Sequence, residues 1–131
     1  MTKSAKERSR PRPRLPRVSD EIKRLAALLE AEVLAWPSVT SRPMFGLNGL
    51  YRGRMIFAVL PRTRALDIPD SIAFRLPRQS QRITAEFRKD ERIVVSRPEA
   101  KWISFVIHSD SDIHDALNWL VLAYREAGKK D

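Results

Sequence analysis

The sequence predicts an α+β fold, a two-layer sandwich in which a mostly antiparallel sheet of about five strands carries an N-terminal and a C-terminal helix on one face. Apolar residues recur at helical spacing in residues 20–35 and again in residues 113–124. Between them, short apolar runs alternate with glycine and proline, which is typical of strands and turns. With no internal repeat, we expect one domain, residues 19–131, behind a basic tail, residues 1–18.

The first helix is predicted over residues 20–35. Ser19 can cap it, and Asp20 and Glu21 suit the positive end of the helix dipole. Pro37 cannot continue the hydrogen-bond ladder, so the helix should end before it. The side chains expected to face the sheet are Ile22, Leu25, Ala26, Leu29 and Val33.

A hairpin is predicted after this helix. Three of the chain's four glycines interrupt short apolar runs here, and glycine accepts the positive φ that tight turns require. We place the tip at residues 51–54, with residues 44–51 leading in and residues 55–60 leading out. The outgoing run is apolar throughout, which indicates either a strand covered on both faces or one with a helix on one face and a loop on the other.

Further strands are predicted in residues 71–76, 92–96 and 101–108, and a short helix in residues 79–89. In the last strand two sets of side chains alternate and so face opposite sides, Trp102, Ser104 and Val106 against Ile103, Phe105 and Ile107. Core burial is the expectation for Trp102, because an indole of this size dominates a small core.

Ser109 or Asp110 is expected to cap the final helix. Its apolar stripe consists of Ile113, Ala116, Leu117, Leu120, Val121 and Tyr124. Trp119 lies off this stripe, where an interface could cover it. Asp112 and Asp115 suit the start of the helix dipole, which explains the local acidic cluster without a bound cation.

Charge is unevenly distributed along the chain. Residues 1–17 contain seven basic residues and one acidic residue, and residues 52–97 contain eleven basic and five acidic residues. Prolines in the tail forbid an α-helix, so we expect a flexible arm. Such an arm can contact nucleic acid or an acidic protein by neutralising charge, or it can act only as a solubilising tail. The candidate contact residues are Arg8, Arg10, Arg12, Arg14 and Arg17.

The sequence offers little for catalysis. Cysteine is absent, so thiolate nucleophiles, thiolate metal sites and disulfides are excluded. His108 and His114 show no metal-ligand spacing, and we predict neither a metal site nor a cofactor. A pocket near Trp102 and His108 is the one candidate for a ligand site.

No run approaches the roughly 20 apolar residues of a membrane span, and the basic N-terminus lacks the apolar stretch of a secretory signal. We therefore expect a cytoplasmic protein without membrane contact. Its oligomeric state is open between monomer and homodimer, because an edge strand can pair across a two-fold axis.

Two segments resemble known families. Residues 42–58, which include Met44-Phe45-Gly46 and Gly53, are similar to the hairpin of the TfoX N-terminal domain family. Residues 102–105 together with residues 112–124 resemble the ending of bacterial proteins of the luciferase domain-containing family. Both resemblances imply a compact α+β domain, and the first implies a regulatory or protein-interaction role.

Two functions follow as expectations. The preferred one is a non-catalytic binding or adaptor domain that contacts nucleic acid or an acidic partner through its basic arm. The alternative is a small-ligand-binding or enzymatic domain with an apolar pocket near Trp102 and His108.

Overall fold

The computed structural model describes residues 17–129, which form three α-helices, one 3₁₀ helix and a six-stranded sheet. The elements are α2 (Asp20–Leu34), β1 (Val39–Met44), β2 (Leu47–Arg52), β3 (Met55–Pro61), β4 (Ser71–Arg75), α3 (Gln81–Lys89), β5 (Ile93–Val94), β6 (Trp102–Val106), η1 (Asp110–Asp112) and α4 (Ile113–Ala127). The strand order is β1-β2-β3-β4-β6-β5, and every pair is antiparallel. The predicted α+β fold is confirmed, with six strands where about five were expected.

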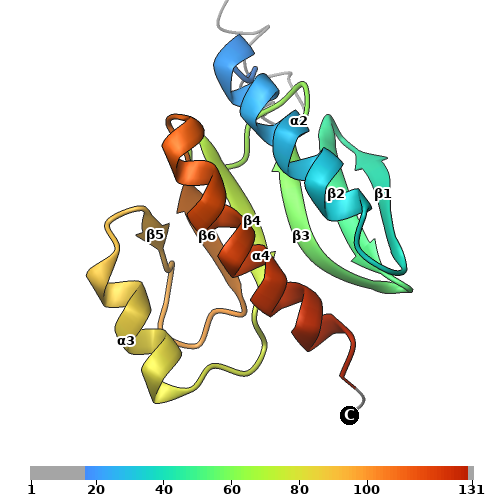
Figure 1. Ribbon diagram of the computed structural model, residues 1–131. Coiled ribbons are helices and arrows are strands. Elements are labelled where there is room, and N and C mark those ends of the chain that lie inside the picture. The colour runs from blue at the N-terminus through green and yellow to red at the C-terminus, as the bar shows by residue number, and fades with distance from the viewer. Residues whose placement is uncertain (1–16, 130–131) are drawn as a thin grey trace, which may run out of the picture.

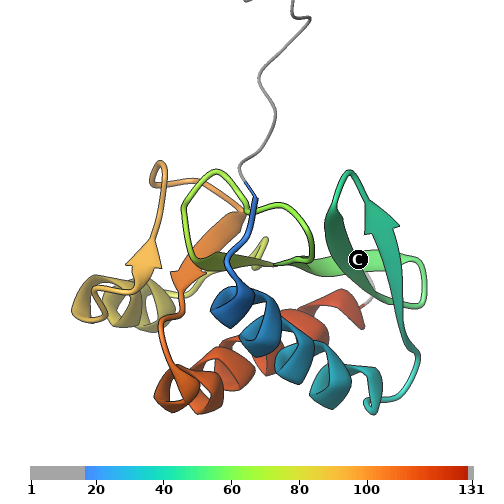
Figure 2. The same cartoon turned by 90° about the horizontal axis from the view of Figure 1, so that it is seen from above.

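The two long helices lie side by side on one face of the sheet (Figure 2). Ser19 caps α2 as predicted, because its hydroxyl accepts a hydrogen bond from the Ile22 N–H at 3.2 Å. The predicted inward residues of α2 are all buried. The sheet-facing side chains of both helices and of the strands form one core, centred on Leu25, Leu29, Phe57, Phe74, Phe105 and Leu120.

The segment predicted to lead into the hairpin is two strands instead of one. Met44 pairs with Leu47, so the chain reverses at Phe45 and Gly46, where φ is 54° and 83°. The turn at Gly53, with φ of 61°, lies where the tip was predicted. The prediction of one strand over residues 44–51 was therefore wrong, because a phenylalanine at this turn gives no local turn signal.

A bulge in the pairing of β2 with β3 explains the run of apolar residues in β3. Leu50 pairs with Ala58 and Tyr51 with Ile56, which leaves Phe57 as the extra residue. Phe57 and Ala58 are both fully buried, whereas Ile56 and Val59 are half-buried. Val59 pairs with Ala73 and not with the helix-facing Phe74, so it lies on the face of the sheet that the long helices leave uncovered.

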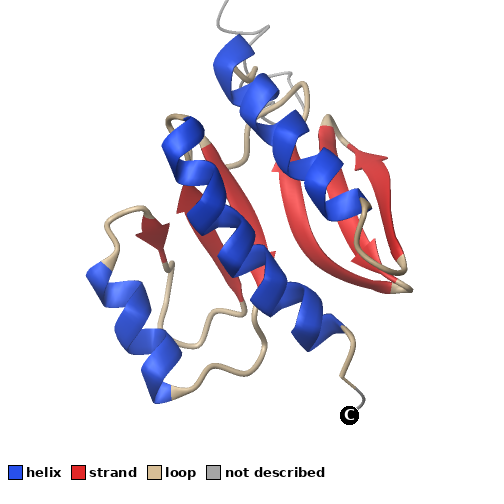
Figure 3. Cartoon of the chain, viewed as in Figure 1, coloured by secondary structure: helices blue, strands red, loops and turns tan. Residues whose placement is uncertain are grey.

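The C-terminal half differs from the prediction in two details. Strand β5, the short arrow next to α3 in Figure 3, is only two residues long. Val95 leaves the ladder and packs against the core. In α4 the buried positions are Ala116, Leu120 and Ala123, while the predicted Val121 is not part of the core. Small alanines at two of these positions let α4 approach β3 and β4 closely.

Trp102 and Trp119 exchange the roles that the sequence predicted. Trp102 is 37% exposed, because the alternation of β6 directs Ile103 and Phe105 to the core and Trp102 to the uncovered face. Trp119 instead stacks on Phe74, with ring centroids 5.6 Å apart and an interplanar angle of 14°. The expectation of core burial for Trp102 was wrong, and Trp119 closes the core between α4 and α3.

Candidate functional site

The turn between β1 and β2 holds an unusual residue. Phe45 and Gly46 are its two loop residues, and both have positive φ, as in a type I′ hairpin turn. Glycine adopts this conformation freely, but a side chain with a Cβ atom pays roughly 1–2 kcal/mol for it. The Phe45 side chain is also 91% exposed, so burial of the ring does not offset that strain. Neither packing nor turn chemistry accounts for a phenylalanine here.

The loop that follows β3 is fixed to this turn. The Gly46 carbonyl accepts hydrogen bonds from the N–H groups of Arg62, Thr63 and Arg64, with N···O distances of 3.2, 2.9 and 3.0 Å. The side chain of Arg64 lies against Gly46, so closely that a Cβ atom on that glycine would collide with it. The loop after β3 therefore holds its position relative to the turn.

The start of the described chain joins the same place. Arg17 and Arg64 form an isolated antiparallel bridge, and the Val18 N–H donates to the Thr63 carbonyl at 3.3 Å. The β1–β2 turn, the loop after β3 and the approach to α2 consequently meet at one end of the molecule, the upper end in Figure 1. We call Arg17, Phe45, Arg62 and Arg64 the basic end.

The arginines of the basic end keep their charge uncompensated. Arg17 and Arg62 are exposed and Arg64 is half-buried, and none of the three takes part in an ion pair among residues 17–129. Asp20 lies three positions after Arg17 in the sequence and Asp67 three positions after Arg64, and neither carboxylate forms an ion pair within residues 17–129. The basic end is therefore a positively charged surface with an aromatic ring standing out from it.

The candidate arm residues fall mostly outside this description. Arg8, Arg10, Arg12 and Arg14 lie outside residues 17–129, and Arg17 is the first residue described. Sequence reasoning missed Phe45, Arg62 and Arg64 as site residues. The available signal was Phe45 directly before the turn glycine, Gly46, followed by the second basic block in residues 52–97. The neighbours of Phe45 in the sequence do not show that the turn and the basic block meet.

The uncovered face of the sheet has a similar character. The Arg42 guanidinium lies 4.9 Å from the centroid of the Tyr51 ring, and Arg75 pairs across strands with the exposed Trp102. No acidic residue lies in any of the six strands. This face thus adds cations and aromatic rings without adding negative charge.

The acidic residues at the start of α4 are structural. Arg92 donates to Asp112 and Asp115 at 2.8 Å each, and Arg24 pairs with Asp110. Burial alone raises the pKa of Asp112, but hydrogen bonds from the His108 N–H, Arg92 and the Ser109 N–H outweigh it and lower that pKa. Among residues 17–129, no group of three or more potential ligands could hold a metal ion.

The structure does not bring Trp102 and His108 together. Trp102 begins β6 and His108 follows its end, which separates them by about 20 Å at the usual rise of a strand. The backbone N–H of His108 donates to Asp112, and the residue is exposed. His114 is exposed as well.

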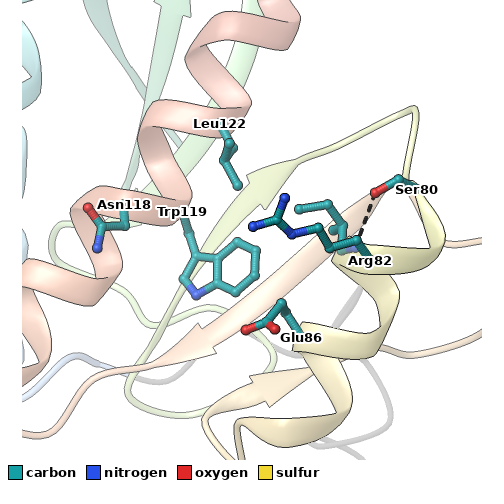
Figure 4. Close-up of a pocket in the computed structure, with 7 residues that line it drawn as sticks. Ser80, Arg82, Glu86, Asn118, Trp119 and Leu122 are labelled. Atoms are coloured by element: carbon teal, nitrogen blue, oxygen red, sulfur yellow. Dashed lines mark hydrogen bonds between the residues drawn. The ribbon is translucent and has the colours of Figure 1, made fainter.

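A shallow groove of about 580 Å³ runs between α3 and α4. The Trp119 indole forms its floor, and Arg82 and Glu86 reach toward it from α3 (Figure 4). Asn118, Ile83, Leu122 and Ser80 complete the lining. The groove contains no nucleophile with a base beside it, and its two charged groups have opposite signs, so it favours no particular ligand.

Comparison of the chain with protein-family models, with curated proteins and with solved structures gave no match. The resemblances to the TfoX N-terminal domain and to the luciferase domain-containing family therefore stay predictions. Within residues 17–129, no helix has the length and apolar character needed to cross a membrane.

Proposed function

We propose that this chain is a non-catalytic binding domain for an anionic partner, which contacts the basic end and the arm that continues from Arg17. One observation carries the proposal: Arg17, Arg62 and Arg64 are gathered by backbone hydrogen bonds and yet form no ion pair with the rest of residues 17–129. Arg24 and Arg92, by contrast, are each surrounded by carboxylates. Arginines held together without counter-charges favour an external anion.

The chemistry of the remaining groups supports binding over catalysis. Nucleophilic catalysis needs a nucleophile, a base within hydrogen-bond reach and a group that orients the base. Residues 17–129 present no such arrangement around His108 or His114, because both histidines are exposed and Asp112 is engaged by Arg92 and by backbone N–H groups. No observation favours the alternative of a pocket near Trp102 and His108.

Salt-titrated binding tests the proposal. The full chain would be titrated into a labelled generic duplex by fluorescence anisotropy, at salt concentrations from about 50 to 200 mM. We expect the logarithm of the association constant to fall linearly with the logarithm of salt, with a slope of about 0.9 for each phosphate neutralised. An unlabelled acidic polypeptide in the same assay would show whether nucleic acid is preferred.

Two variants and one control locate the surface. Replacing Arg62 and Arg64 by glutamine should reduce the slope by about 1 to 2. Replacing the four tail arginines, residues 8, 10, 12 and 14, should reduce it further. The control replaces Arg82 and Arg88, which are exposed on α3 and change the net charge equally. Equal losses in the control and in the basic-end variant would contradict the proposal, as would no binding at low salt.

A further inference from the structure

Phe45 combines two unfavourable properties that the fold does not require. Its backbone lies in the left-handed region at φ of 54°, and its ring is 91% exposed to solvent. Asparagine or glycine would form the same turn without strain, and either would remove the exposed apolar surface. A strained and exposed aromatic residue on a rigid turn is typical of a recognition element.

The surroundings of Phe45 indicate what it recognises. The loop that carries Arg62 and Arg64 is tied to Gly46, the residue next to Phe45, by three backbone hydrogen bonds, so the backbone positions of the two arginines are fixed relative to the turn. A ring beside unpaired arginines suits a ligand that offers flat apolar groups and negative charges at close intervals. Single-stranded nucleic acid has this chemistry, since its bases are free to stack and its phosphates repeat along the backbone.

We propose that Phe45 is a stacking platform for a base of single-stranded nucleic acid, whose phosphates contact Arg17, Arg62 and Arg64. This inference rests on the proposed function. A second copy of this chain fits the basic end poorly, because two such surfaces carry the same charge. A regular duplex also fits less well, since its base faces are covered by their neighbours in the stack. The uncovered face of the sheet, where the Arg42 guanidinium lies over the Tyr51 ring, can extend the path of the bound nucleic acid.

The experiment separates the contribution of the nucleic-acid bases to binding from that of the sugar-phosphate backbone. The full chain would be titrated by anisotropy with a pyrimidine single strand of roughly 12 nucleotides, within the usual site size, and with a base-free strand of equal length and charge. Phe45→Ala should weaken binding to the first strand roughly 5- to 150-fold and leave binding to the base-free strand unchanged. Phe45→Trp should retain or strengthen binding to the base-bearing strand.

The matched control is Leu34→Ala, which removes another exposed apolar side chain at a distance from the basic end, on α2. It should change neither affinity. Arg62→Gln with Arg64→Gln should weaken binding to both strands and lower the salt dependence. Thermal melting of each variant would check that the fold is retained.

The outcomes distinguish this inference from the function on which it rests. If Phe45→Ala weakens binding to the base-bearing and the base-free strand equally, or weakens neither, the proposal of base stacking is wrong. The arginine variants can still support the anion-binding function in that case. If the arginine variants change nothing, the anion-binding function itself is wrong. If Phe45→Ala weakened binding to a duplex as much as binding to the single strand, Phe45 would act as a wedge between base pairs and not as a platform for a single strand. Self-association that Phe45→Ala abolishes would identify the ring as a dimer contact and overturn the inference.

Discussion

Arg92 links the segment before β5 to the start of α4 by donating from Nη1 to the Asp112 carboxylate at 2.8 Å. Its other nitrogens donate to Asp90 and Asp115, and the guanidinium lies 4.8 Å from the centroid of the Phe105 ring. The side chains of Arg92, Asp90 and Asp112 are largely withdrawn from water. This network therefore differs from the exposed ion pairs elsewhere on the surface, which contribute little.

Replacing Arg92 by alanine should destabilise the domain by about 2–3 kcal/mol, because three carboxylates lose a charged hydrogen-bond donor and two of them are poorly solvated. Arg92→Lys should recover only part of this, since an ammonium group cannot reproduce the fork of a guanidinium. Urea unfolding followed by circular dichroism measures both. Arg88→Ala, an exposed position on α3, is the control and should stay within about 0.5 kcal/mol of the parent. If Arg92→Ala lowered the free energy of unfolding by no more than Arg88→Ala does, the network would not stabilise the fold.

The same network predicts how stability depends on pH. The Arg92 side chain lowers the pKa of Asp90, and the pKa of Asp112 is lowered as well. Because these folded-state pKa values lie below the unfolded ones, the stabilisation is fully present above the ordinary value near 3.8. It is lost as the pH falls from there through the folded-state pKa.

The unfolding free energy should therefore fall as the pH is lowered below about 4, and Arg92→Ala should make this dependence shallower. Denaturant titrations at a series of pH values measure the difference between the two proteins. A parallel pH dependence in both would mean that Arg92 does not set these pKa values.

Much of the fold was predictable because its signals are local. The helix predicted over residues 20–35, the Ser19 cap and the turn at Gly53 each depend on neighbours in the chain. Each was confirmed, with the helix ending one residue earlier, at Leu34. The exposure of Trp102 was not predictable in this way. Alternation in β6 shows that two faces exist, but only the placement of α2 and α4 decides which face is covered.

The candidate site was less accessible to sequence reasoning for the same physical reason. Phe45 is not a turn residue by propensity, and its turn is fixed by pairing of Met44 with Leu47 and by hydrogen bonds to residues 62–64. The hydrogen bonds to residues 62–64 join Gly46 to a segment that lies beyond β2 and β3 in the chain. The charge pattern indicated an anionic partner, but the meeting of Arg17 with Arg64 required the structure.

Two glycines of the same strand pair should respond to alanine for different reasons. A Cβ atom at Gly49 would lie 2.9 Å from Met44 Sδ and 3.2 Å from Tyr51 Cε1, whereas one at Gly53 would meet nothing within 4 Å. Gly49→Ala should cost about 1–3 kcal/mol through crowding. Gly53→Ala should cost roughly 1–2 kcal/mol through its positive φ.

Met44→Ala separates the two causes. Added to Gly49→Ala, it removes the sulfur atom in the way and should recover part of the lost stability; added to Gly53→Ala, it should recover none. Double-mutant cycles in urea give the coupling energies. Equal coupling in both cycles would show that side-chain crowding at Gly49 is not the cause.

Replacing Phe45 by glycine should stabilise the domain by about 1 kcal/mol, which is opposite to the usual effect of removing an aromatic side chain. The ring is exposed and contributes little to the core, while glycine adopts the φ of 54° without strain. Phe45→Asn should act in the same direction, because asparagine tolerates this conformation. Phe105→Ala, at a fully buried ring, should instead cost about 3–5 kcal/mol. Thermal and urea unfolding of the three variants against the parent gives the sign directly. A loss of stability in Phe45→Gly would mean that the ring does contribute to the fold, and its presence at the turn would then need no partner to explain it.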